Sequence, residues 1–254
     1  MSDYNRNIAA RGGFADRAAI DVGLRAYMLR VYNYMASAVA LTGVVAWLCF
    51  QAAGGDAIQV AGGTISGVTP FGQLILGGYT PIILMLATLG LVFFISFRVN
   101  TLQYTTALGL FMLYAALLGA ALTSIFVVYT GGSITRVFFI SAASFGALSL
   151  YGYTTQRNLS AMGSFMIMGL FGIILASLVN LFLKSSGLDW AISVIGVGVF
   201  AGLTAWDTQR IKEMYDVNDD GTVSGRKAVM GALSLYLDFI NLFLMLLRLV
   251  GDRR

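Results

Sequence analysis

The sequence contains no histidine and only one cysteine among its 254 residues. Without histidine, the HExxH motif of zinc metalloproteases and the histidine-dependent serine nucleophiles are both excluded. Cys49 has no second cysteine to pair with, so no intramolecular disulfide can form. The three lysines all lie outside the last apolar segment, which excludes a light-driven pump that binds retinal there. We expect no enzymatic activity and no tightly bound cofactor.

Charged residues are also scarce, at 11% of the chain against about 25% in ordinary soluble domains. Hydrophobic residues make up 58%, and the mean hydropathy is +0.80. Seven apolar segments reach or approach the roughly 20 residues that a helix needs to cross a ~30 Å hydrocarbon core. These segments are 31–53, 80–97, 105–129, 137–154, 161–183, 190–206 and 229–250. The sequence therefore predicts an all-α integral membrane protein with seven transmembrane helices, surrounded by lipid and without a nucleic-acid partner.

The first apolar segment follows about thirty polar, arginine-bearing residues with no small-residue cleavage site behind them. We therefore interpret it as a retained span and not as a removable signal peptide. The expected organisation is a cytoplasmic N-terminal tail over 1–30 and a single membrane domain over 31–254. The connection 54–79 is rich in glycine and threonine, and we expect it to be irregular and partly packed on the bundle.

Lysine and arginine are distributed unevenly between the connections. Eleven of the 16 precede the first span or lie in alternate connections on its side, which the positive-inside rule assigns to the cytoplasm. Seven full crossings would place Arg248, Arg253 and Arg254 outside, which the rule disfavours. Either the last helix crosses late, held by its neighbours, or it re-enters and returns. The eleven are Arg6, Arg11, Arg17, Arg25, Arg30, Arg98, Arg157, Arg210, Lys212, Arg226 and Lys227.

The last apolar segment, LSLYLDFINLFLMLLRLVG, carries polar residues within a membrane-length stretch. On a helix that turns about 100° per residue, Ser234, Asp238, Asn241 and Arg248 fall within an arc of about 80°. An aspartate at the centre of a span costs about 2.5–3.5 kcal/mol, so such residues usually face the bundle interior and mark pathways or relays. The alternative is an Asp238 that is hydrogen-bonded for packing alone.

A second carboxylate, Asp207, ends the apolar part of GLTAWDTQRIKEMY. A rise of about 1.5 Å per residue places it about 27 Å from Asp189, near the inner boundary of the hydrocarbon core. Asp238 reaches the same depth if the last helix begins in the cytosol near Ser224. The alternative is an Asp207 that is simply solvated at the end of its helix.

The segments AWDTQRIKEMY and GALSLYLDFINLFLMLLRLVG resemble the C-terminal signature of the transmembrane Bax inhibitor motif family, in its bacterial branch. The resemblance implies a bacterial inner-membrane protein with six helices around a central seventh. It also implies that Asp207 and Asp238 face each other as a proton- and calcium-sensing pair. Arg98, in FFISFRVNTLQY, matches an arginine that the family places near the sixth-span aspartate in a closed state; alternatively, it is a positive-inside anchor.

Two carboxylates at close range cannot both ionise cheaply, so we expect the pair to share a proton and titrate as a unit. Deprotonation would create a repulsion that an arginine or a divalent cation relieves, giving two arrangements governed by pH. Calcium takes about six to eight oxygen ligands. Asn241, backbone carbonyls or water would have to complete the shell, and the affinity should be weak.

The resemblance suggests two functions. Family members are described as pH-dependent calcium leak channels, and this is the function that we expect, with calcium as the transported or sensed ion. Some bacterial relatives instead bind and inhibit a membrane-anchored protease, and the N-terminal tail would then be the natural contact. A proton-coupled transporter is a third possibility, but it requires a substrate cavity that the sequence does not locate.

The segment DVNDDGTVSGRK, at 216–227, partly matches the calcium loop of an EF-hand. Its twelfth position should be a bidentate glutamate and is Lys227, so a positive charge stands where the strongest ligand belongs. We therefore interpret the segment as a cytoplasmic turn rich in Asp, Asn and Gly, and not as the principal calcium site.

Overall fold

The computed structural model describes the backbone of residues 2–61, 64–99 and 101–254, and the side chains of 22–59, 66–99 and 101–254. Within these residues, seven segments are helical, long and apolar enough to cross a membrane, which confirms the predicted fold class. The helices are α1 Ser2–Ala53, α2 Pro70–Leu76, α3 Thr80–Arg98, α4 Tyr104–Ala121, α5 Thr123–Val128, α6 Gly131–Thr154, α7 Ser160–Leu183, α8 Ser186–Glu213 and α9 Gly221–Val250. Together α4 and α5 form one span, with a break at Leu122.

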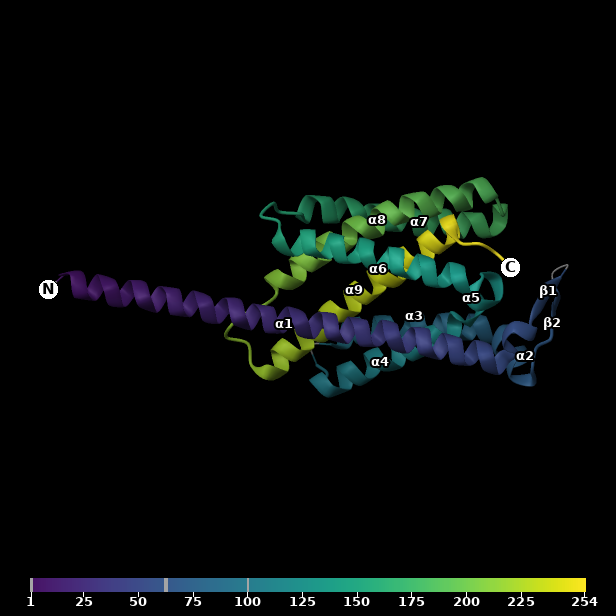
Figure 1. The fold of residues 1–254 in the computed structure, drawn as a ribbon, viewed down its shortest axis with the longest axis horizontal. Helices are drawn as coiled ribbons and strands as arrows, with labels where there is room; N and C mark the ends of the chain where they lie inside the picture. The colour runs from purple at the N-terminus through teal and green to yellow at the C-terminus, as the bar shows by residue number, and fades with distance from the viewer. Residues whose placement is uncertain (1, 62–63, 100) are drawn as a thin grey trace.

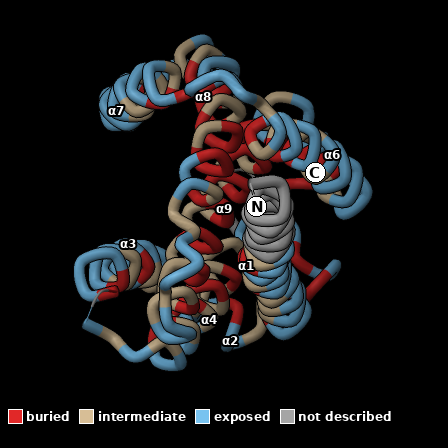
Figure 2. The backbone as a smooth tube through the Cα atoms, turned by 90° about the vertical axis from the view of Figure 1, so that its left-hand side faces the viewer, coloured by how far each residue is buried: buried red, intermediate tan, exposed pale blue. Residues whose placement is uncertain are grey.

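Helix α9 is the centre of the bundle. In the most apolar stretch of α9, 67% of the residues are buried, whereas in the corresponding stretch of α7 only 6% are buried. Helices α1, α4, α6 and α8 pack directly against α9, whereas α3 packs mainly on α4 and α7 on α8. Figure 2 shows the buried residues of α9 running through the middle, with α3 and α7 on the periphery. The expected arrangement of six helices around a seventh is therefore confirmed.

Local sequence signals set several helix starts. Ser185, Thr130 and Asp220 are the N-caps of α8, α6 and α9, and each side chain accepts a hydrogen bond from a backbone N–H of the first turn. Pro70 and Pro81 lie in the first turns of α2 and α3, where their missing N–H groups need no partner.

The two ends of the bundle are distinct. We call the end with the N-terminus and the connections 155–159 and 214–220 the inner end, and the opposite one the outer end (Figure 1). Helix α1 runs without a break from Ser2 and extends beyond the bundle at the inner end. The expected boundary between 1–30 and 31–254 therefore falls inside one helix, and residues 22–30 belong to the first candidate span.

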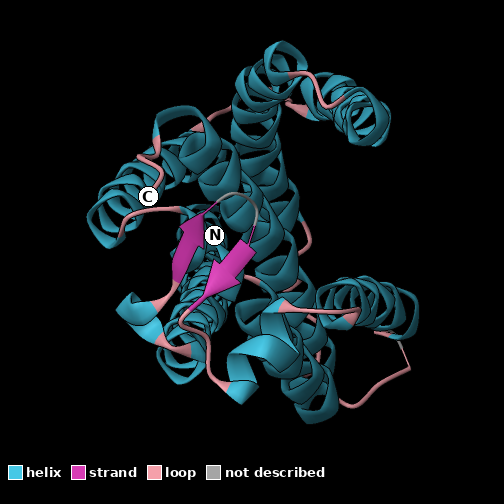
Figure 3. Ribbon diagram, turned by 90° about the vertical axis from the view of Figure 1, so that its right-hand side faces the viewer, coloured by secondary structure: helices cyan, strands magenta, loops and turns pink. Residues whose placement is uncertain are grey.

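The connection 54–79 is more regular than its composition suggested. It holds a 3-10 turn, Gly55–Ala57, a two-stranded antiparallel sheet of β1 Gln59–Ala61 and β2 Thr64–Ser66, and helix α2 (Figure 3). Gly67 has a φ of +74°, which permits the turn out of β2. The Thr69 hydroxyl caps α2 and donates to the carbonyl of Ala52 at 2.7 Å, so this connection is tied to the end of α1.

Helix α9 is one unbroken helix, long and apolar enough to cross a membrane, which contradicts a last segment that re-enters and returns. Residues 251–254, which we call the C-terminal strap, lie at the outer end. The Thr130 N–H donates to the Asp252 carbonyl at 3.0 Å, and the Arg254 N–H donates to the Val128 carbonyl at 2.9 Å. Arg254 also forms an ion pair with Asp56 at 3.0 Å. Arg254 therefore has a carboxylate partner at this end of the bundle.

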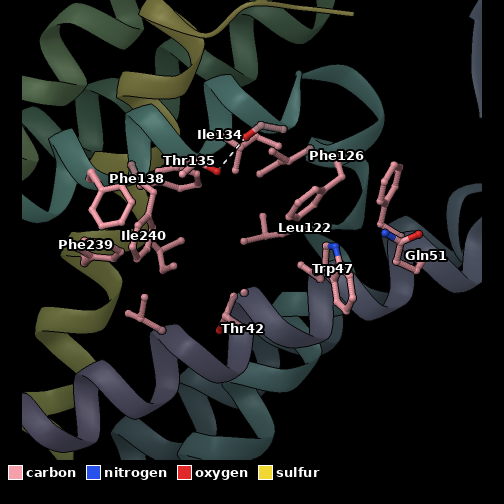
Figure 4. Close-up of a pocket in the computed structure, with 18 of the residues that line it drawn as sticks. Thr42, Trp47, Gln51, Leu122, Phe126, Ile134, Thr135, Phe138, Phe239 and Ile240 are labelled. Atoms are coloured by element: carbon pink, nitrogen blue, oxygen red, sulfur yellow. Dashed lines mark hydrogen bonds between the residues drawn. The ribbon is translucent and has the colours of Figure 1, made fainter. Parts of the chain in front are cut away.

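An apolar cavity of about 590 Å³ lies beside this strap, between α1, α5, α6 and α9. Figure 4 shows Trp47 and Phe126 on one side of it and Phe138 on the other. Arg254 and Asp56 both line this outer cavity, so the cation at its rim is already paired.

Candidate functional site

The structure brings Asp207 of α8 and Asp238 of α9 together. These two helices form the most extensive helix contact of the chain. Both aspartates are buried, with exposed fractions of 7% and 5%, and their carboxyl groups lie close enough for a side-chain hydrogen bond if one of them is protonated. A hydrogen bond between two carboxyl groups requires that one of them carries a proton. The geometry is therefore that of a proton-sharing pair.

The pair has acceptor capacity that the protein does not use. Asp207 Oδ1 and Asp238 Oδ2 are buried and have no hydrogen-bond partner. Buried carboxylate oxygens without partners are costly, and each such case in a native structure requires an explanation. Asp207 Oδ1 has the Arg210 guanidinium as an ion-pair partner, so Asp238 Oδ2 is the atom that a further cation or water would satisfy.

Arg210 supplies the local positive charge. Its Nη2 lies 2.8 Å from Asp207 Oδ1 as an ion pair, although without hydrogen-bond geometry, and 3.5 Å from Ser234 Oγ. The guanidinium stacks over the Trp206 ring at 4.7 Å from its centroid. Trp206 in turn packs against Gly163 of α7, where any Cβ would collide with the indole. The arginine is thus held in place by its own helix and by α7.

The pair opens onto a cavity of about 610 Å³ between α7, α8 and α9. Its walls are mostly apolar side chains such as Leu170 and Phe200. The polar side chains that line it include Asp207, Asp238, Arg210, Ser234 and Asn241. Because α7 packs on the periphery of the bundle, the cavity lies at the side of the central helix α9. The carboxylate oxygens that an ion would find there are those of the two aspartates.

Comparison with known proteins decides the family. Residues 24–254 match the sequence profile of the family described as "Inhibitor of apoptosis-promoting Bax1". The inner membrane protein YbhL of Escherichia coli K12 is 46% identical, with 91% of this chain and 94% of YbhL covered. The chain belongs to the Bax inhibitor-1 family.

Other members of the Bax inhibitor-1 family share the full length. The protein RP147 of Rickettsia prowazekii is 46% identical over 100% of both chains. A membrane protein of Streptococcus pyogenes, SpyM3_0260, is 37% identical over 91% of this chain and 94% of its own. The names of these relatives establish a membrane protein, and the YbhL name places that relative in the inner membrane.

Not every residue that the family resemblance singled out lies at the aspartate pair. Arg98 ends α3, which packs on α4 and α2 rather than on α8. Within the described part of the chain, the cation paired with Asp207 is Arg210 and not Arg98. The expected approach of Arg98 in a closed state stays a prediction about another arrangement of this Bax inhibitor-1 protein.

The predicted polar face of the last span divides between two places. Ser234, Asp238 and Asn241 line the same cavity, and the Asn241 amide donates to the Leu237 carbonyl at 2.8 Å. Arg248 lies farther along α9, near the outer end, and its Nη1 is 3.9 Å from Asp189 Oδ1. The outer arginine is therefore a partner of the start of α8 and not of the aspartate pair.

The acidic loop before α9 uses its carboxylates within the chain. Asp220 caps α9, and Asp219 forms an ion pair with Lys227 at 2.5 Å. Asp216 accepts hydrogen bonds from the backbone and side-chain N–H groups of Asn218, and these bonds lower the pKa of its carboxyl group. These contacts use one carboxylate oxygen each of Asp216, Asp219 and Asp220 within the loop itself.

Arg210 is the functional residue that sequence reasoning missed. In the sequence it counted only as a cytoplasmic charge. Its position three residues after Asp207 is the spacing at which helical side chains meet, and this was the available signal.

Proposed function

We propose that this chain is a pH-sensitive calcium leak pathway of a bacterial inner membrane, with Asp207 and Asp238 as its sensor. The observation that carries the proposal is the buried pair, in which Asp207 Oδ1 is paired with Arg210 and Asp238 Oδ2 has no hydrogen-bond partner. Membership in the Bax inhibitor-1 family supports the same reading. On the charge count, the N-terminus and the connections of the inner end are cytoplasmic.

The charges of the site explain how pH would act. A pair with one shared proton carries a single negative charge, which Arg210 balances, so the site is neutral and tolerable at membrane depth. Loss of the shared proton leaves an uncompensated negative charge in a buried place. Such a site attracts a cation and pushes the two helices apart unless a cation arrives. Protons and calcium therefore compete for the same oxygens.

Calcium would need more ligands than the pair provides. Within the described residues, no group of three or more acidic, cysteine or histidine side chains is placed to hold a metal. The Asn241 side-chain oxygen and the Ser234 hydroxyl line the same cavity and offer two further oxygens. The remaining ligands would be waters or carbonyls, which gives weak and reversible binding suited to a leak.

We propose that an ion would move toward the outer end along the contact between α8 and α9. Asp207, Gly196 and Asp189 share one face of α8, since spacings of 11 and 7 residues return a helix to nearly the same side. Met245 of α9 lies against Gly196, between the aspartate pair and the ion pair of Asp189 with Arg248. We assign Met245 as the apolar barrier on this route.

Calcium flux into liposomes tests the proposal, because it needs no partner protein. The full chain and its Asp207→Asn and Asp238→Asn variants are reconstituted with a calcium dye and measured from pH 5 to 8. The parent flux should depend on pH, and its half-saturating calcium concentration should fall as pH rises. Both variants should flatten the pH profile, and Asp238→Asn should also weaken calcium dependence. Asp216→Asn, an exposed aspartate of the inner end, is the matched control.

An unchanged pH profile in both variants would reduce the pair to packing. The alternative function, restraint of a membrane-anchored protease, would then lead. The observation that favours this alternative is the extension of α1 beyond the bundle, where a partner could contact it (Figure 1). Deletion of 2–21 should abolish protease restraint and leave calcium flux intact if the two roles are separate.

A further inference from the structure

Besides the outer cavity and the cavity at the aspartate pair, the bundle has an apolar groove at its inner end. It has a volume of about 560 Å³ and is lined only by α1 and α6. Met28, Leu29, Phe145 and Leu150 give it apolar walls. Gly146 opens one side, since a Cβ built there would meet no atom within 4 Å. The groove is therefore wide enough to admit a flexible chain.

The back of the groove is fixed by a chain of hydroxyl groups. The Tyr32 hydroxyl lies 2.7 Å from Ser149 Oγ, and Ser149 Oγ lies 2.9 Å from Thr208 Oγ1. The first bond links α1 to α6, and the second links α6 to α8. They satisfy the polar atoms behind the groove, so its interior presents mainly carbon to an occupant.

Positive charge stands at the inner rim of the groove. Arg25 lines it, is exposed, and has no ion pair among the residues that the structure describes. Lys212 approaches Tyr153, another lining residue, with its Nζ 5.2 Å from the ring centroid and 2.9 Å from the Tyr153 carbonyl. Among the residues whose side chains the structure describes, no carboxylate lines the groove. The outer cavity differs on this point, because its arginine is paired with Asp56.

We propose that the groove between α1 and α6 binds one anionic phospholipid of the inner-end leaflet. An acyl chain lies along Met28, Leu29, Phe145 and Leu150, and the headgroup phosphate meets Arg25. The basic rim selects an anionic lipid over a zwitterionic one, because each basic residue near the surface contributes about fivefold in affinity. The apolar walls select a lipid over a free phosphate ion.

Lipid binding to the delipidated full chain in detergent tests this site. Native mass spectrometry is used to count bound phosphatidylglycerol and phosphatidylcholine with identical acyl chains, and inorganic phosphate is a third probe. Arg25→Gln removes the rim charge. Gly146→Leu fills the groove from a position with open space. The matched controls are Arg30→Gln, an exposed arginine of the same helix, and Gly109→Leu, an exposed glycine of α4 with open space around it.

The parent should retain one phosphatidylglycerol with roughly fivefold or greater preference over phosphatidylcholine. Arg25→Gln should remove the preference while phosphatidylcholine still binds, and Gly146→Leu should reduce binding of both lipids. Neither control should change binding, and phosphate alone should not bind. The proposal is overturned by a parent without preference, by an equal loss in Arg30→Gln, or by full binding in Gly146→Leu.

Discussion

Arg210 keeps a positive charge beside the aspartate pair, and its removal should change the pH response of the site. Replacement by glutamine leaves the negative charges without their balancing cation, so ionisation becomes less favourable. We expect Arg210→Gln to move the midpoint of calcium flux to higher pH by about one unit or more. Liposome flux from pH 5 to 9 measures this shift. An equal shift in Arg98→Gln would show that Arg98 takes this role in another arrangement.

Met245 is the side chain that separates the aspartate pair from the outer end of α8. Its thioether lies against Gly196, where the backbone of α8 has no side chain to fill the space. Met245→Ala should therefore open the route and raise basal calcium flux severalfold, with the pH dependence preserved. Leu246→Ala is the control, since Leu246 neighbours Met245 but does not line the cavity. Equal flux in both variants would contradict the barrier role.

The approach of α6 to α8 determines where Asp207 stands, and Gly152 is the residue that permits it. A Cβ at Gly152 would lie 2.1 Å from the Ala205 carbonyl oxygen, which belongs to backbone and cannot move aside. We expect Gly152→Ala to lower the stability of the protein by about 1–3 kcal/mol. Thermal unfolding in detergent measures the loss. Gly146→Ala on the same helix meets open space and should not destabilise.

The acidic loop before α9 should have little part in calcium flux. The hydrogen bonds from Asn218 lower the pKa of the Asp216 carboxyl group. They therefore stabilise the loop at pH values above the ordinary pKa of an aspartate, and this stabilisation is lost as the pH falls through the lowered pKa. The loop should therefore stay constant from pH 5 to 8. Asp216→Asn combined with Asp220→Asn keeps an acceptable N-cap and should leave flux nearly intact. A loss as large as that of Asp238→Asn would identify the loop as a calcium site.

At the scale of the whole molecule, orientation is the property to test. We expect the hairpin connection outside and the loop before α9 in the cytoplasm. In a Cys49→Ser background, Gln59→Cys should react with an impermeant maleimide in intact cells, whereas Asn218→Cys should react only after permeabilisation. Both positions are exposed, so the difference reports on sidedness. The reverse pattern would invert the topology.

The seven spans were predictable because apolar length alone defines a helix that crosses lipid. The meeting of Asp207 and Asp238 was predictable from depth and from the family signature. The partner of Asp207 was missed because the family resemblance pointed to Arg98, although the three-residue spacing to Arg210 on the same helix was a usable signal. The hairpin at 59–66 was missed, although Gly62-Gly63 between two short segments with β-branched residues is a recognised signal for a two-residue hairpin turn.

The C-terminal strap determines how the central helix can move. Backbone hydrogen bonds and the ion pair of Arg254 with Asp56 anchor the outer end of α9 to the α5–α6 junction and to the segment after α1. Sliding of α9 along its axis would break all of these contacts together. Repulsion between Asp207 and Asp238 would instead rotate α9 about its outer end, which the strap holds in place. The Gly221 end of the helix would then move farthest.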